Sequence, residues 1–104
     1  MERDIEPRAA DALVRQGALA VDVREPAELV EDGRIEGALH VPLGDLAQRA
    51  EELPRDRTLV MICRSGTRSA MATEALRASG YDAYNVDGGI LRWERDGLPV
   101  ARNP

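Results

Sequence analysis

The sequence contains no lysine and no phenylalanine, and it has only one cysteine and one histidine. A single cysteine excludes an internal disulfide and a CxxC redox pair, and together with a single histidine it excludes a Cys/His zinc site. The absence of lysine excludes a lysine Schiff base and the lysine of a phosphate-binding P-loop. Because only three residues are aromatic, the core has to be built from Val, Ile, Leu, Ala and Met.

The balance of charge is acidic, with 14 arginines against 19 aspartates and glutamates, a net charge of -5. We therefore expect neither a nucleic acid nor a membrane as partner, because the molecule as a whole repels polyanions and anionic lipid. No apolar run approaches the roughly 18 residues of a membrane span, and the N-terminus lacks the basic-then-apolar order of a signal peptide. A lone free thiol suits a reducing compartment, so we expect a cytoplasmic protein.

The length of 104 residues is that of one domain, and we expect a single domain over 1–104. Strand-like and helical patterns of apolar residues alternate along the chain. The expected strands are 19–23, 38–41, 58–62 and 83–86, and the expected helices are 7–17, 26–33, 43–53, 68–79 and 90–96. This alternation predicts an α/β fold, an open and mainly parallel sheet with helices on both faces.

The segment CRSGTRS at 63–69 follows a continuous apolar run, TLVMI at 58–62, which is typical of a central strand buried on both faces. Ligands of open α/β sheets bind at the edge where such strands end. Gly66 would let the loop curl so that its N–H groups converge on an anion, beside the positive end of the next helix. This surrounding would favour the thiolate of Cys63, and Arg64 and Arg68 would add local positive charge.

Cys63 has a second interpretation, because most free cysteines are small buried hydrophobic residues. We favour a reactive thiol, since a core cysteine needs neither flanking arginines nor a glycine-centred loop. The only imidazole is that of His40, whose apolar neighbours indicate a hydrogen-bonded structural role rather than that of a catalytic base. Cys63 would then act as a thiolate produced by its surroundings, without a Cys–His pair.

The loop Cys63 to Ser69 resembles the active-site loop of the rhodanese-like sulfurtransferases. Further segments resemble signatures of the same family in the same order: VDVREP at 21–26, GALHVP at 37–42, DGG at 87–89, and Trp93 with GLPV at 97–100. The resemblance covers nearly the whole chain. It implies a five-stranded parallel sheet flanked by helices and an active-site cysteine that carries sulfur as a persulfide.

The resemblance also implies roles for individual residues. Cys63 corresponds to the sulfur-carrying nucleophile, and the loop around the persulfide corresponds to Arg64, Ser65, Gly66, Thr67 and Arg68. Asp22 and Arg24 correspond to positions of mainly architectural importance, and we expect Arg24 to pair with Glu28 at a helix start. Trp93 is expected to pack the last helix, and Gly88 and Gly89 to let the backbone turn beside the loop. Arg34 and Glu36 stand where the family commonly has His and Pro.

The resemblance therefore predicts a sulfurtransferase. It would accept sulfane sulfur from thiosulfate or another persulfide and pass it to a nucleophilic acceptor such as cyanide, a thiol or a partner protein. No metal or organic cofactor is required. One alternative is a cysteine-dependent phosphatase or arsenate reductase, but these need arginine at the sixth place after the cysteine, where this chain has Ser69. The other is a rhodanese-like module for binding or sulfur relay with little free turnover.

Overall fold

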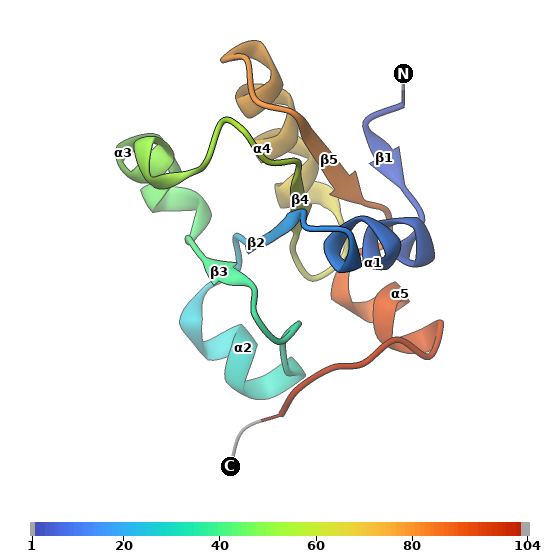
Figure 1. Ribbon diagram of the computed structural model, residues 1–104. Coiled ribbons are helices and arrows are strands. Elements are labelled where there is room, and N and C mark those ends of the chain that lie inside the picture. The colour runs from blue at the N-terminus through green and yellow to red at the C-terminus, as the bar shows by residue number, and fades with distance from the viewer. Residues whose placement is uncertain (1, 103–104) are drawn as a thin grey trace.

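The central strand of the sheet is β4 (Leu59–Ile62), and all four of its residues are buried. The computed structural model describes residues 2–102 and contains a five-stranded sheet in the order β1-β5-β4-β2-β3 (Figure 1). The other strands are β1 (Asp4–Ile5), β2 (Leu19–Asp22), β3 (Leu39–His40) and β5 (Ala83–Val86), and every neighbouring pair is parallel. The parallel sheet expected from the alternating pattern is confirmed.

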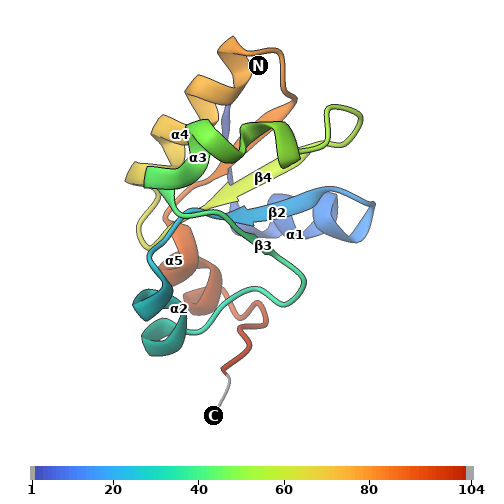
Figure 2. The ribbon, with the colours of Figure 1, turned by 90° about the vertical axis from the view of Figure 1, so that its left-hand side faces the viewer.

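Helices cover both faces of the sheet, as expected (Figure 2). On one face lie α1 (Pro7–Arg15) and α5 (Gly89–Arg95), and on the other lie α3 (Leu46–Arg49) and α4 (Thr67–Ala78). The short helix α2 (Pro26–Asp32) connects β2 to β3, and it begins with a proline after a capping box formed by Glu25 and Glu28. Within residues 2–102 no helix is long and apolar enough to cross a membrane.

Alternate residues of β4 divide the core into two layers, since successive side chains of a strand point to opposite faces. Leu59 and Met61 pack toward the α3 and α4 side, in a cluster with Leu46 and Leu76. Val60 and Ile62 belong to the cluster on the other face, with Ala10, Ile90 and Trp93. Trp93 is buried and its Nε1 donates to the carbonyl of Pro99 at 2.8 Å, so it packs the last helix as expected.

Two elements differ from the sequence prediction. The continuous helix expected over 43–53 is divided into a 3-10 turn η1 (Leu43–Asp45), the four-residue α3, and a second 3-10 turn η2 (Ala50–Glu52). The N–H of Leu43 donates to the carbonyl of Val23, a residue outside this segment, and this bond fixes the first turn. Gly44, in the same turn, has a low propensity for the α-helix. The strand β1 was not among the predicted strands, because two residues are too short to show alternation.

The buried side chain of Arg24 joins the end of β2 to the end of α2. The guanidinium of Arg24, 0% exposed, donates to the carboxylate of Asp22 at 2.7 Å and to the carbonyl of Gly33 at 2.8 Å. The expected pair between Arg24 and Glu28 is wrong, since Arg24 reaches only the main-chain carbonyl of Glu28, at 3.4 Å. The reason is geometric. Asp22 is two residues from Arg24 along an extended segment, so the two side chains lie on the same side. The carboxylate of Glu28 pairs instead with Arg68.

Candidate functional site

Cys63 lies directly after the central strand, where the chain turns into α4. The turn is made at Gly66, which precedes the helix with a φ of 101°. A side chain there would be strained, and its Cβ would lie 3.1 Å from the amide nitrogen of Gly88. The expectation of a glycine-centred loop between a buried strand and a helix is met, and the loop packs closely against the turn before α5.

Three hydrogen-bond donors converge on the sulfur atom of Cys63. The amide nitrogen of Gly66 is 3.1 Å from Sγ, the amide nitrogen of Ser69 is 3.4 Å away, and the hydroxyl of Ser69 is 3.2 Å away. Burial raises the pKa of Cys63, but the Ser69 hydroxyl and the amides of Ser69, Gly66 and Ser65 together bring that pKa below its ordinary value. The loop therefore favours a thiolate by hydrogen bonds.

The local positive charge expected from Arg64 and Arg68 is offset, because both side chains meet carboxylates of α2. Arg68 makes a two-pronged ion pair with Glu28, with both N···O distances 2.7 Å. Arg64 lies 3.4 Å from Asp32. The hydrogen bond from Arg68 lowers the pKa of Glu28 to about 2. Sequence reasoning could not foresee this pairing, because it depends on how α2 folds back over the loop.

Ser69 ends the predicted loop but was given no role at the sulfur, and Asn85 was not predicted to lie near it. The Ser69 hydroxyl lies between Cys63 Sγ and the side-chain oxygen of Asn85, which is 2.5 Å away. Asn85 comes from β5 and is 3% exposed, and its Nδ2 donates to Asp4 and to the carbonyl of Gly66. One signal was available, since an amide in the strand AYNV has to find partners once it is buried.

The turn before α5 holds the loop from the other side. The amide of Ile90 donates to the carbonyl of Cys63 at 2.8 Å, and the amide of Leu91 donates to that of Arg64 at 3.2 Å. Gly89 has a φ of 63°, and a Cβ on it would collide with the carbonyl of Arg64 and come within 2.6 Å of that of Cys63. The expected role of the glycine pair beside the loop is confirmed.

His40 takes part in structure, as predicted. Its Nε2 lies 2.6 Å from the carbonyl oxygen of Arg24, a geometry in which Nε2 carries the hydrogen and donates. Arg34 and Glu36, the two departures from the family pattern, are exposed, and Arg34 forms a two-bond bridge with Ala101. Among residues 2–102 no group of three or more His, Cys, Asp or Glu side chains is arranged to hold a metal ion.

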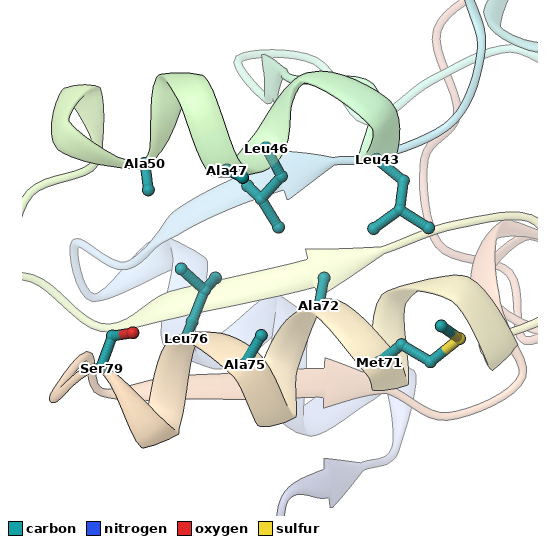
Figure 3. A pocket seen from close by; sticks show the side chains of 9 residues that line it. All are labelled: Leu43, Leu46, Ala47, Ala50, Met71, Ala72, Ala75, Leu76 and Ser79. Atoms are coloured by element: carbon teal, nitrogen blue, oxygen red, sulfur yellow. The ribbon is translucent and has the colours of Figure 1, made fainter.

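Two hollows border α4. One, of about 500 Å³, is an apolar groove between α3 and α4 and contains none of the residues 63–69 (Figure 3). The other, of about 430 Å³, lies beside the loop and is lined in part by Ser65, Gly66 and Thr67 together with Asp4 and Asn85. The exposed side chains of Ser65 and Thr67 therefore face a space that a small molecule can enter.

A family described as the rhodanese-like domain matches residues 6–96. The chain belongs to this rhodanese-like family. A sulfurtransferase from Allochromatium vinosum is 43% identical over 86 residues, which are 82% of this chain and 79% of that protein. The thiosulfate sulfurtransferase GlpE of Pseudomonas syringae is 38% identical over 86% of this chain and 84% of its own length. The family resemblance noted in the sequence is thus confirmed.

Solved structures of the rhodanese-like family share the fold. A rhodanese-related protein from Thermoplasma volcanium has a TM-score of 0.90 and 34% identity, and the match covers 97% of this chain and 99% of that one. The correspondence along both chains means that the strand order and helix arrangement described above are those of a rhodanese-like domain.

Proposed function

We propose that this protein transfers sulfane sulfur through a persulfide on Cys63. The observation that carries the proposal is the convergence of three donors on Sγ, which favours a nucleophilic thiolate without a neighbouring imidazole. The amides of the same loop would hold the outer sulfur of a persulfide, because they face the negative charge that it carries. The membership of the rhodanese-like family and the names of relatives support this chemistry.

The reaction is a double displacement. The Cys63 thiolate attacks the outer sulfur of thiosulfate, so that a bond forms between Sγ and that sulfur while the sulfur–sulfur bond of thiosulfate breaks and sulfite leaves with the electron pair. An acceptor such as cyanide or a thiolate then attacks the outer sulfur of the persulfide. The bond to Sγ breaks, and Cys63 leaves as a thiolate ready for the next cycle.

Other donors fit the same chemistry, including a persulfide on another protein or on a small thiol. The pairing of Arg64 with Asp32 and of Arg68 with Glu28 reduces the attraction of the loop for an anion, although neither pair is buried. A thiol of another protein can act as the acceptor by the same displacement at the outer sulfur. We place this transfer in the cytoplasm, where a reduced cysteine persists.

Steady-state kinetics with thiosulfate and cyanide test the proposal. We expect parallel lines in double-reciprocal plots, because sulfite leaves before cyanide reacts, and we expect Cys63→Ser to abolish thiocyanate formation. Aryl phosphates serve as the competing substrate class. Hydrolysis of aryl phosphates by the unchanged protein, lost in Cys63→Ser and without any thiocyanate formation, would replace sulfur transfer by phosphatase chemistry.

A further inference from the structure

The hydroxyl of Ser69 lies between two acceptors inside the protein. Its Oγ is 3.2 Å from Sγ of Cys63 and 2.5 Å from Oδ1 of Asn85. Ser69 is 0% exposed and Asn85 is 3% exposed, so both groups have to find their partners within the fold. A hydroxyl has one hydrogen and donates to only one of these acceptors at a time.

The orientation of the Asn85 amide is fixed by its other contacts. Its Nδ2 lies 3.0 Å from Oδ1 of Asp4 and 3.1 Å from the carbonyl oxygen of Gly66. Both of these atoms accept hydrogen bonds, so the amide nitrogen has to face them and the amide oxygen has to face Ser69. Asn85 therefore presents an acceptor, and never a donor, to the Ser69 hydroxyl.

The strength of Sγ as an acceptor for the Ser69 hydroxyl changes during the reaction. As a thiolate, Sγ is charged and a strong acceptor, whereas in a thiol or a persulfide the charge is absent from Sγ and its acceptor strength is low. We propose that Asn85 is a positioning residue that receives the Ser69 hydroxyl hydrogen whenever Sγ is uncharged and competes for it when Sγ is a thiolate. The part concerning the persulfide rests on the function proposed above.

Two opposite effects follow from this competition. Ser69 alone stabilises the thiolate, because its hydroxyl donates to a charged sulfur. Asn85 stabilises the uncharged states, because without it the buried hydroxyl would have no good acceptor when Sγ is a thiol or a persulfide. The pair thus helps the charge to leave Sγ for the outer sulfur during loading.

The charged groups around Cys63 fall into five pairs of partners. They are already paired or hydrogen-bonded: Arg68 with Glu28, Arg64 with Asp32, Arg24 with Asp22, Asp87 with Arg92, and Asp4 with Asn85. Substitutions at Ser69 and Asn85 leave all of them in place except that Asp4 loses one donor. The variant Asp4→Asn tests the charge of Asp4 by itself, because its amide oxygen can still accept from Asn85.

The test follows the pH dependence of Cys63 alkylation by iodoacetamide in the full chain. In Asn85→Leu the pKa of Cys63 should fall by about 0.5 or more, because Asn85 no longer competes for the Ser69 hydroxyl. This fall corresponds to a change of about threefold in the ratio of thiol to thiolate. In Ser69→Ala that pKa should rise by about as much. The double variant should match Ser69→Ala, because Asn85 acts on the sulfur only through the hydroxyl.

The second readout is the rate of persulfide formation with thiosulfate, measured at a pH where Cys63 is fully ionised in every variant. Asn85→Leu should load sulfur about threefold to tenfold more slowly and release it to cyanide faster, because the uncharged Sγ of the persulfide leaves the hydroxyl without an acceptor. The double variant should load sulfur at the same rate as Ser69→Ala, because Asn85→Leu slows loading only when the Ser69 hydroxyl is present. This non-additivity separates positioning from general damage.

Thr73→Val is the matched control, because Thr73 is buried and donates to the carbonyl of Ser69 at 2.7 Å without reaching the sulfur. It and Asp4→Asn should leave the pKa of Cys63 within about 0.2 of its value in the unchanged protein. If Asn85→Leu does not fold by circular dichroism, Asn85→Val, which suits a strand, takes its place with the same expected result.

An unchanged or raised pKa of Cys63 in a folded Asn85 variant would overturn the proposal, and so would a shift that persists in the Ser69→Ala background. A different result concerns the proposed function alone. If the alkylation shifts are as expected but neither the unchanged protein nor any variant takes up sulfur, the competition for the hydroxyl is supported and the proposed sulfur transfer is wrong.

Discussion

At the scale of single residues, the thiolate of Cys63 depends on uncharged neighbours. Its sulfur receives hydrogen bonds from two main-chain amides and one hydroxyl, whereas the nearby arginines are bound to carboxylates of α2. Such donors are fixed in place by the turn and the helix start, so they need no rearrangement when the charge forms. The reactivity of Cys63 should therefore depend on the loop geometry more than on the arginine side chains.

The first prediction compares Arg68→Ala with Ser69→Ala. Cys63 of the unchanged protein should react with iodoacetamide at a pH below that at which a free thiol, of pKa about 8.5, reacts. Arg68→Ala should change this profile less than Ser69→Ala does, because the Ser69 side chain donates one of the hydrogen bonds to Sγ and the Arg68 side chain donates none of them. A larger change in the Arg68 variant would mean that charge, not hydrogen bonding, sets the reactivity.

The residues on one continuous segment were the ones that the sequence could predict. Cys63 and its loop follow from a buried strand, a glycine and a helix start, all adjacent in the chain. The partners of the loop come from elsewhere: Glu28 from α2 and Asn85 from β5. Their contributions depend on which strands are neighbours and on how a helix returns over the sheet edge, which no single sequence pattern specifies.

At the scale of elements, the loop is held between α4, which it precedes, and the turn that begins α5. The carbonyls of Cys63 and Arg64 accept hydrogen bonds from the first turn of α5, and Gly89 lies against the same carbonyls. A side chain on Gly89 would need the loop to move, since main-chain atoms cannot swing aside as a flexible side chain can. The position of Sγ therefore depends on this glycine.

The second prediction concerns Gly89→Ala, with Gly97→Ala as its control. Both glycines have a positive φ, so the backbone strain of each substitution should destabilise the protein by about 1–2 kcal/mol, and Gly89→Ala should destabilise it further because its methyl group also meets main-chain atoms. Only at Gly89 does the added methyl group meet the loop, because Gly97 has open space around it. Gly89→Ala should lower kcat/KM for sulfur transfer about tenfold or more, and Gly97→Ala should leave it nearly unchanged. Equal activities of the two variants would contradict the account of the loop.

The elements themselves were predictable where the local signals were strong. The long apolar run of β4 and the apolar spacing over α4 lie close to their expected bounds. The segment 43–53 has helical spacing too, yet main-chain contact with Val23 and a glycine in its first turn divide it into short turns. In this segment, tertiary contacts outweigh the helical periodicity of the sequence.

At the scale of the whole molecule, ion pairs join elements that are distant in sequence. Arg68 at the start of α4 and Glu28 on α2 are 40 residues apart, and their pairing holds α2 against the sheet edge that carries Cys63. The pKa of Glu28 is about 2 in the folded protein, against its usual 4.5. Since the folded pKa is the lower one, the pair stabilises the fold above pH 4.5, and that contribution is lost as the pH falls toward 2.

The third prediction tests this pair through the pH dependence of unfolding by urea. The loss of stability between pH 4.5 and pH 2 should be smaller in Glu28→Gln than in the unchanged protein, because the variant has no carboxylate to protonate there. Glu31→Gln, which removes an exposed charge from the same helix, is the control and should retain the larger loss. Parallel curves for Glu28→Gln and the unchanged protein would show that the pair contributes nothing to stability.

The central claim is that Cys63 carries sulfur, and the mass of the intact protein tests it most directly. After incubation with thiosulfate and removal of the excess, the protein should be heavier by one sulfur atom, and cyanide should restore the original mass while thiocyanate appears. Cys63→Ser should stay at its own mass throughout, since the chain has no second cysteine. An unchanged mass of the folded, reduced protein, under conditions in which a known sulfurtransferase is loaded, would contradict the account.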